Sequence, residues 1–432
     1  MKIIYKIIML LLITSVSYGQ VPVPADPQSG PIMLVGGTAH LGTGEIIENA
    51  VIAFDKGKLT AVGNASDNIS QADHQVIDIS GKHIYPGFIL PNSQVGLKEV
   101  ESIRHMNDFG ERGTIKPNVR SIISYNTDSE YPPTFRFNGI LLAETTPTGG
   151  IISGTSSVVE FDGWNWEDAA HTMDMAIHMN WPSKMSRRFD RSTFTIVNEP
   201  NKNFDKTVDE INKLFTDAVS YAKLASKPAN LKLASMQGLF DGSKVLMIHS
   251  SNPKEVIESI KFAKMQGVSK IVIITNDAAW FVRDFLKENN IPVIMSQTHR
   301  RPARADYDYD MSYKLPGMLT DAGLSVSLSW NGMLSRARNL PFLAGTAAAY
   351  GMEKEEALKT ITLNTAKALG VDNRVGSIEV GKDATIFVSE GDALDMRGNN
   401  ITHAFISGKL VTLDNKQEAL YNRYSDKYGH IR

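Results

Sequence analysis

The middle of the chain alternates apolar runs with amphipathic segments. Residues 245–248 are apolar without interruption, which is typical of a strand buried on both faces. Residues 253–266 then carry apolar side chains at helical spacing and end at Gly267. Residues 271–274 form a second uninterrupted apolar run. This succession of strand, helix and strand predicts a parallel α/β arrangement.

The same alternation continues toward the C-terminus. We expect a helix over 278–288, strands over 291–294 and 324–328, and a long helix over 353–369. A stretch of about 290 residues with this period suits a (β/α)8 TIM barrel, which we place at 87–375. An open doubly wound sheet is the alternative, but it calls for a Gly-rich GxGxxG turn that the sequence lacks.

The two ends of the chain have a different sequence pattern from the middle. Residues 31–86 and 376–414 both consist of short β-rich runs separated by Gly, Asn and Asp, as hairpins usually are. This shared pattern predicts one small composite β-sandwich domain formed from both chain ends. Residues 415–432 are a polar C-terminal tail, and residues 101–232 have no readable strand register.

The first nineteen residues have the pattern of a secretory signal peptide. Lys2 and Lys6 precede an apolar run over 7–16, and small residues follow at Ser17 and Gly19. The apolar run is shorter than the roughly 20 residues that cross a bilayer. We therefore expect residues 1–19 to be removed and the protein to be periplasmic or secreted.

Composition narrows the classes of function. The sequence has 45 Lys and Arg against 47 Asp and Glu, a formal net charge of −2, which argues against a nucleic-acid partner. It has no cysteine, which excludes disulfides, thiolate metal ligands, a thiol nucleophile and a lipid-accepting cysteine. Its apolar content of 42% and charged content of 21% are those of a folded globular chain.

Several segments resemble the amidohydrolase superfamily. The sequence GKHIYPGFI at 81–89 is similar to the entry into that superfamily's barrel, and NTAKALG at 364–370 with VGSIEVGKDA at 375–384 is similar to its return into the β domain. ARNLPF at 337–342 and AAAYG at 347–351 resemble its imidazolonepropionase-like branch more specifically. The resemblance covers most of the chain beyond the signal and implies a barrel enzyme.

The resemblance also locates the family's metal-ligand positions. It puts the His-x-His pair at Asn92 and Gln94, the fifth-strand histidine at His249, the sixth-strand ligand near Asn276 and the eighth-strand aspartate near Asn331. Zinc is normally held by imidazole, thiolate or carboxylate groups, and an amide cannot take a proton from water. We therefore expect degenerate ligand positions and no bound metal; any cofactor would be a divalent metal such as zinc.

Two groups of residues are candidates for the site. His249 and Asn331 occupy catalytic positions, and a histidine at the carboxyl end of a barrel strand usually lies in the site. His299, Arg300, Arg301 and Arg304 could bind an anionic substrate group, since arginine pairs well with carboxylates. The alternative for these arginines is pairing with the acidic residues that follow them, over 306–310.

The histidines of residues 171–179 have two interpretations. His171 and His178 alternate with three methionines, a mixture of imidazole and thioether that soft copper favours. Methionine more often only fills gaps in a core. We favour the packing interpretation.

Two hypotheses for function follow. The resemblance implies an exported hydrolase of carbon–nitrogen, non-peptide bonds in a small amide or cyclic amide, with a site rebuilt around His249 and helped by Asp277 or the arginine-rich loop. The alternative is a metal-free pseudoenzyme that serves as a ligand-binding or partner subunit. Either way we expect a small-molecule ligand, no nucleic acid and no membrane insertion after signal cleavage. Candidate protein partners are a second copy of the chain or an active amidohydrolase relative.

The signal peptide is directly testable. Cleavage after Gly19 leaves Gln20 as the first residue of the exported protein. Mass spectrometry of protein recovered from the periplasm or the medium should find this N-terminus. A chain that keeps Met1 and stays in the cytoplasm would contradict the prediction.

Overall fold

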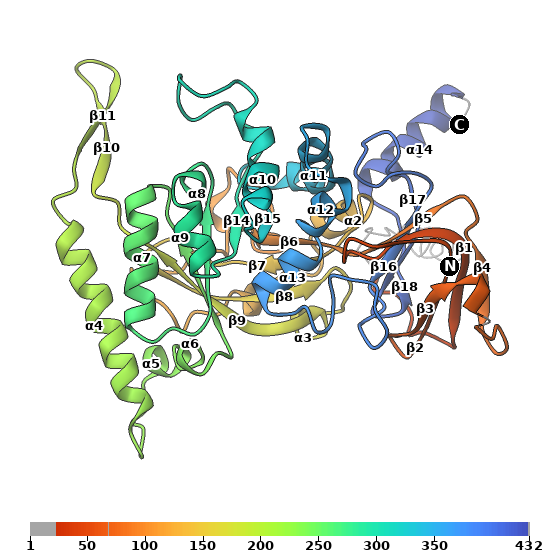
Figure 1. The fold of residues 1–432 in the computed structure, drawn as a ribbon, viewed down its shortest axis with the longest axis horizontal. Coiled ribbons are helices and arrows are strands. Elements are labelled where there is room, and N and C mark those ends of the chain that lie inside the picture. The colour runs from red at the N-terminus through yellow and green to blue at the C-terminus, as the bar shows by residue number, and fades with distance from the viewer. Residues whose placement is uncertain (1–22, 68, 431–432) are drawn as a thin grey trace, which may run out of the picture.

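The computed structural model describes residues 23–67 and 69–430, and Figure 1 shows them as a large strand–helix part beside a smaller part made mainly of strands. The expected signal peptide lies outside the described residues. In the part of the chain that is described, no helix is long and apolar enough to cross a membrane.

The smaller part is a sheet that joins strands from both ends of the chain. Its N-terminal strands are β1 (Ile32–His40), β2 (Ile46–Asp55), β3 (Lys58–Asn64), β4 (Gln75–Asp78) and β5 (His83–Pro86). Its C-terminal strands are β16 (Ile386–Ser389), β17 (Ile401–Ile406) and β18 (Lys409–Leu410). The strand order is β18-β17-β16-β5-β1-β2-β3, with β4 beside β1. Because β16 pairs antiparallel with β5, the two chain ends share one continuous hydrogen-bonded sheet.

The larger part is built on an eight-stranded sheet that curls into a barrel. Its strands are β6 (Phe88–Ser93), β7 (Ile140–Thr145), β8 (Ile152–Glu160), β9 (Ala170–Asn180), β12 (Val245–His249), β13 (Ile271–Thr275), β14 (Val293–Met295) and β15 (Val326–Leu328), paired in this order. Neighbouring strands are parallel except around β8, which runs antiparallel to β7 and β9. The fold is thus the expected (β/α)8 barrel with a β-rich domain, with one barrel strand reversed.

Helices cover the outside of the barrel (Figure 1). In chain order the α-helices are α2 (Tyr131–Arg136), α3 (Trp166–Ala169), α4 (Phe204–Ala222), α5 (Leu231–Ser235), α6 (Gly238–Asp241), α7 (Pro253–Met265), α8 (Ala278–Phe281), α9 (Arg283–Glu288), α10 (Met311–Asp321), α11 (Leu340–Ala349), α12 (Lys354–Lys359), α13 (Leu363–Leu369) and α14 (Lys416–Tyr428). The short 3-10 helices are η1 (Ala65–Asp67), η2 (Arg104–Met106), η3 (Ser121–Ser124) and η4 (Leu334–Asn339). A hairpin of β10 (Met185–Asp190) and β11 (Thr195–Pro200) projects from the barrel in Figure 1.

The reversed strand explains why the sequence over 101–232 shows no readable strand register. Parallel strands need a crossover helix between them, whereas antiparallel neighbours need only a turn. β7, β8 and β9 follow one another as an antiparallel meander, with only the four-residue α3 between β8 and β9. The strand–helix period that identifies the later strands is therefore missing here.

The long helix expected over 353–369 is interrupted, and the interruption lies at the gap between the last barrel strand and the first. α12 ends at Lys359 and α13 begins at Leu363. Between them, the carbonyl oxygen of Thr360 accepts from the Leu328 amide at 3.0 Å, and that of Ile361 accepts from the Ile89 amide at 2.9 Å. These two bonds satisfy backbone amides at the gap between the last strand, β15, and the first, β6.

A buried carboxylate links the barrel to the composite sheet. Asp383 is 3% exposed and accepts from His171 Nε2 at 3.1 Å and from Arg374 Nε at 2.8 Å. The Lys58 ammonium lies 2.5 Å from its other oxygen. Burial raises the pKa of Asp383, but hydrogen bonds from His171 and Lys58 outweigh it, and the net result is a pKa of about 2. The charge of Asp383 thus links three elements: β9, β3 and the segment after α13.

We expect Asp383→Asn to lower the free energy of unfolding at pH 7 by about 2 kcal/mol, the equivalent of a pKa shift from 3.8 to about 2. The folded-state pKa lies below the unfolded one, so this stabilisation is complete above pH 4 and is lost as the pH falls toward 2. The difference between wild type and variant should therefore shrink below pH 4. Urea unfolding between pH 7 and pH 3 measures it.

Asp306→Asn is the matched control. Asp306 pairs with Arg304 in an exposed loop, where solvent screens the charges, so no measurable change is expected. If the difference for Asp383→Asn stayed constant down to pH 3, the charge of Asp383 would not be what holds this junction together.

Candidate functional site

Polar side chains surround a cavity at the carboxyl ends of the barrel strands. The cavity has a volume of about 170 Å³ and is lined by Asn92 and Gln94 at the end of β6, Asn180 at the end of β9, His249 at the end of β12 and Asn331 after β15. In barrels of this class, the site lies at this end of the strands. We refer to it as the mouth cavity.

A hydrogen-bonded chain of three side chains leads from the barrel interior to the mouth cavity. Glu144 of β7 and His178 of β9 are fully buried, and His178 Nε2 lies 2.9 Å from Glu144 Oε1. His178 Nδ1 lies 3.0 Å from His249 Nε2. His249 is partly exposed and lines the cavity. A buried carboxylate is therefore connected to the mouth through two imidazoles.

The Glu144 carboxylate is fully compensated where it lies. Besides His178, it accepts from Ser156 Oγ of β8 at 2.7 Å and from the backbone amide of Asn92 at 2.7 Å. Burial raises the pKa of Glu144, but the charge and hydrogen bond of His178 and the bonds from Ser156 and Asn92 outweigh it, so the pKa is lowered. Glu144 is consequently a carboxylate at neutral pH.

The carboxylate determines which nitrogen of each imidazole carries the proton. A carboxylate only accepts, so His178 Nε2 must donate to it. In a neutral His178, Nδ1 then accepts from His249 Nε2–H, and Nδ1 of His249 is left with a lone pair at the mouth. When His178 carries an added proton, the bond between the histidines reverses, and His249 offers Nδ1–H instead. The hydrogen-bonded chain of side chains can thus accept one proton at the mouth cavity and return it.

The two histidines have different surroundings. Burial, and secondarily the charge of His178, lowers the pKa of His249 to about 3. His178 has the Glu144 carboxylate beside it, whereas His249 has no carboxylate among its hydrogen-bond partners in the described residues. The carboxylate that could stabilise a positive charge on this pair of histidines therefore lies beside His178, one imidazole away from the cavity.

Asn92 has a structural role in addition to its place at the mouth. Its φ of 50° lies in the left-handed region, which Asn adopts more readily than most residues. This conformation accompanies the hydrogen bond from the Asn92 amide to Glu144. An asparagine at this position therefore suits the backbone turn as well as the cavity wall.

The other positions singled out from the sequence lie outside the mouth cavity. The Asn276 amide donates to Ser296 Oγ at 2.9 Å and accepts from the Ser296 backbone amide at 3.1 Å, which ties the end of β13 to the end of β14. Asp277 forms an ion pair with Arg300. Arg304 pairs with Asp306, as its alternative interpretation expected. Arg301 is exposed.

His299 faces a different cavity. That cavity has a volume of about 710 Å³ and lies between α11 and the loop before β17. His299 Nε2 is 2.7 Å from Thr346 Oγ1. The structure therefore separates His299 from His249, and a substrate-binding role for His299 and the three arginines remains a prediction.

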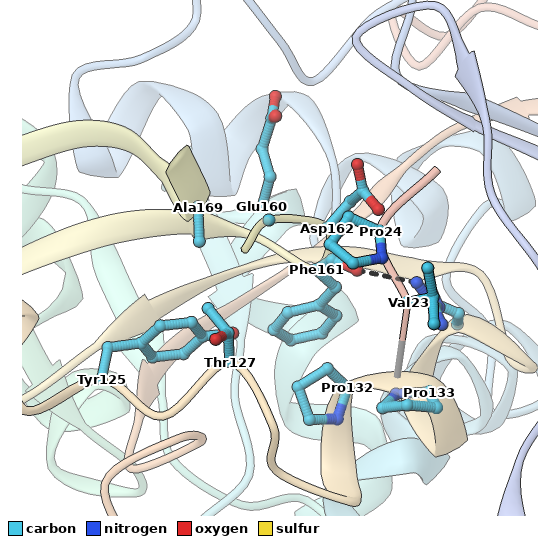
Figure 2. Close-up of a pocket in the computed structure, with 12 residues that line it drawn as sticks. Val23, Pro24, Tyr125, Thr127, Pro132, Pro133, Glu160, Phe161, Asp162 and Ala169 are labelled. Atoms are coloured by element: carbon cyan, nitrogen blue, oxygen red, sulfur yellow. Dashed lines mark hydrogen bonds between the residues drawn. The ribbon is translucent and has the colours of Figure 1, made fainter. Parts of the chain in front are cut away.

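Figure 2 shows a further small cavity, where Val23 and Pro24 lie near Phe161. Its volume is about 20 Å³, enough for about one water molecule. Arg136 Nη1 donates to the Phe161 carbonyl at 3.0 Å, and the Ala25 amide donates to Asp162 at 2.9 Å. This region anchors the N-terminal segment to the barrel and is too small for a substrate.

Sequence reasoning identified His249 but missed Glu144, His178 and Ser156 as members of the site. Glu144 ends an apolar run, ILLAE, whose other side chains are buried in the core. A charged residue inside such a run was the available signal, since buried carboxylates require partners. His178 was noted only as a weak copper candidate. His171, the other histidine of that group, bonds to Asp383, and His178 bonds to Glu144.

The resemblance implies a divalent metal, and the donors at the mouth can be compared with that requirement. The mouth cavity offers one free imidazole nitrogen, on His249, among amide side chains. A catalytic zinc site normally has three imidazole, thiolate or carboxylate ligands. Within 23–67 and 69–430, no group of three or more His, Asp or Glu side chains is arranged to hold a metal ion. This donor set does not fit a zinc centre, and no step below passes through a metal.

Comparison with known proteins gives consistent matches. Residues 216–411 match the model of the amidohydrolase family. The imidazolonepropionase of Fusobacterium nucleatum is 35% identical over 101 residues, which cover 22% of this chain and 24% of that protein. The imidazolonepropionase of Streptococcus pyogenes is 23% identical over 407 residues, 85% of this chain and 91% of that one. In the shorter matches of higher identity, the chain spans about a quarter of the relatives' length.

Solved structures share the fold. The crystal structure of an amidohydrolase from Thermotoga maritima superposes with a TM-score of 0.75 at 22% sequence identity, covering 88% of this chain and 99% of that one. The likeness extends over both the eight-stranded barrel sheet and the β-rich part. Nearly half of the chain matches the amidohydrolase family, and most of the chain is similar to imidazolonepropionases.

Proposed function

We propose that this protein hydrolyses a carbon–nitrogen, non-peptide bond in a small amide or cyclic amide, and that His249 moves the protons. The observation that carries the proposal is the hydrogen-bonded chain from Glu144 through His178 to His249. The match of residues 216–411 to the amidohydrolase family supports the class of reaction. We further propose that the protein acts outside the cytoplasm, on the basis of the signal pattern at residues 1–19.

In the first half of the reaction the hydrogen-bonded chain of Glu144, His178 and His249 acts as a base. His249 Nδ1 takes a proton from a water molecule as the water oxygen bonds to the carbonyl carbon. The Nε2 proton of His249 passes to His178, where Glu144 stabilises the positive charge. The electron pair of the carbonyl moves onto its oxygen, toward which the NH2 groups of Asn92 and Asn331 can donate hydrogen bonds.

In the second half the chain acts as an acid. The oxygen's electron pair re-forms the carbonyl, and the carbon–nitrogen bond breaks. His249 Nδ1–H gives its proton to the leaving nitrogen, while His178 returns a proton to His249 Nε2. The products are a carboxylic acid and an amine, and the enzyme regains its starting protonation. One group that serves as base and then as acid meets both proton-transfer needs of the reaction.

The alternative is a metal-free pseudoenzyme that binds a ligand or a partner. The observation in its favour is Asn331: the resemblance puts the family's proton-accepting carboxylate there, and this exposed amide cannot take that role. Under this alternative the His178–His249 pair only orients a ligand.

Metal content is a first test of the proposed mechanism. Purified protein should retain well under one equivalent of zinc, manganese or iron after dialysis, because a single imidazole among amides is a weak site. Elemental analysis measures this directly. About one tightly held metal ion per chain would overturn the metal-free mechanism and restore the family's usual one.

Turnover of cyclic amides tests His249 and Glu144 together. On any ring that the wild type opens, His249→Ala should lower kcat by roughly 10²–10⁴-fold. Glu144→Gln should lower kcat with little change in KM, because no carboxylate then stabilises the cation on His178. Steady-state assays with hydantoin, glutarimide and 2-pyrrolidinone, followed by chromatography, measure both effects.

The control is His74→Ala, which removes a partly exposed histidine of the β-rich part that bonds only to the nearby Ala72 carbonyl among the described contacts. It should leave kcat and KM unchanged, and thermal unfolding of all three variants checks that they fold. Failure of the wild type to open any ring would favour the pseudoenzyme. Full activity of His249→Ala would remove the proton chain from the mechanism.

A further inference from the structure

None of the residues that line the mouth cavity carries a formal charge at neutral pH. The lining contains four amide side chains, those of Asn92, Gln94, Asn180 and Asn331, and the neutral imidazole of His249. Its other members are apolar residues, hydroxyl residues and a glycine. A ligand there meets hydrogen-bond donors and acceptors, but no ionic partner.

These amides have unused hydrogen-bonding capacity. In the described part of the chain, no partner is found for the side-chain amides of Asn92, Gln94 and Asn331, so each offers a donor and an acceptor. The Asn180 NH2 group donates to the Gly150 carbonyl at 2.8 Å and to Ser153 Oγ at 3.0 Å, which leaves its carbonyl oxygen open. The wall thus matches a ring that has both N–H and C=O groups.

The charged groups just behind the wall are paired or occupied by protein partners, with His178 beside Glu144 and Lys98 beside Glu101. The Glu144 carboxylate lies under Asn92. Glu101 Oε1 accepts from the backbone amide of Leu334, a wall residue, at 2.8 Å, and Lys98 lies 3.2 Å from the same oxygen. The Lys116 ammonium donates to the carbonyl oxygens of Glu111 at 2.9 Å and of Thr148, a wall residue, at 3.4 Å, but Lys116 itself does not line the cavity. Burial lowers the pKa of Lys116. No Lys or Arg side chain is among the described residues that line the cavity.

We infer that the mouth cavity selects an uncharged cyclic amide or ureide and rejects the same ring when it bears a carboxylate. The inference rests on the proposed function for the choice of ring, but the charge selection follows from the wall itself. A carboxylate brought into this cavity would lose water without gaining a cation, because no Lys or Arg lines the wall. A neutral amide group of the same shape would find partners among the free amides.

A matched pair of ligands tests the inference. Hydantoin-5-acetamide and hydantoin-5-acetate have the same ring and nearly the same shape, and they differ in charge at pH 7. The wild-type protein without its signal peptide should bind the acetamide at least ~10-fold more tightly than the acetate, as expected for an unpaired buried charge. Isothermal titration calorimetry at pH 7 measures both dissociation constants.

An engineered cation provides the converse test. Asn331 is an exposed residue of the cavity wall, so Asn331→Arg should fold and should bring a guanidinium to the mouth. This variant should reverse the preference and bind the acetate more tightly, since arginine pairs with carboxylates. Asn331→Gln, which adds length without charge, should keep the wild-type preference.

The outcomes separate this inference from the proposed function. Preferred binding of the acetamide without turnover would support the charge selection and count against hydrolysis. Hydrolysis of the acetate at a rate equal to that of the acetamide would support hydrolysis and overturn the charge selection. Equal or tighter binding of the acetate by the wild type, or no binding of either ligand at millimolar concentration, would also overturn it.

Discussion

The buried carboxylate of Glu144 constrains the relative positions of three barrel strands around it. A charge in an apolar interior is tolerated only when hydrogen bonds and an opposite charge compensate it. Here the compensating groups come from the end of β6 at Asn92, from β8 at Ser156 and from β9 at His178. These strands must keep their relative positions, because a shift of one strand would remove one of the three groups that compensate the buried carboxylate.

The reversed strand, β8, supplies one of these compensating groups. β8 runs antiparallel to its neighbours, yet it faces Ser156 toward the same interior point as Glu144 and His178. The polar chain therefore depends on three strands of the meander, and β12 contributes only its last residue, His249. The protein combines an apolar barrel core with one polar path that leads from the interior to the mouth.

Much of the fold could be predicted from local pattern. The apolar runs before His249 and over 271–274 are strands β12 and β13, because strands buried on both faces need apolar side chains throughout. The pattern over 353–369 indicated helix correctly but could not reveal the break at Thr360 and Ile361. That break is set by backbone amides of β15 and β6, which are distant in sequence.

The candidate site, like the fold, could be predicted from the sequence only in part. The sequence by itself determined that His249 ends a barrel strand and that amides stand at Asn92 and Asn331, because strand ends and side-chain chemistry are local properties. Only the tertiary structure decided that Glu144 and His178 complete the site. They lie 34 residues apart in sequence and meet at 2.9 Å only because β7, β8 and β9 fold as a meander. The periodicity of the sequence does not indicate such a contact, because the packing of the strands in three dimensions decides which groups lie beside a buried charge.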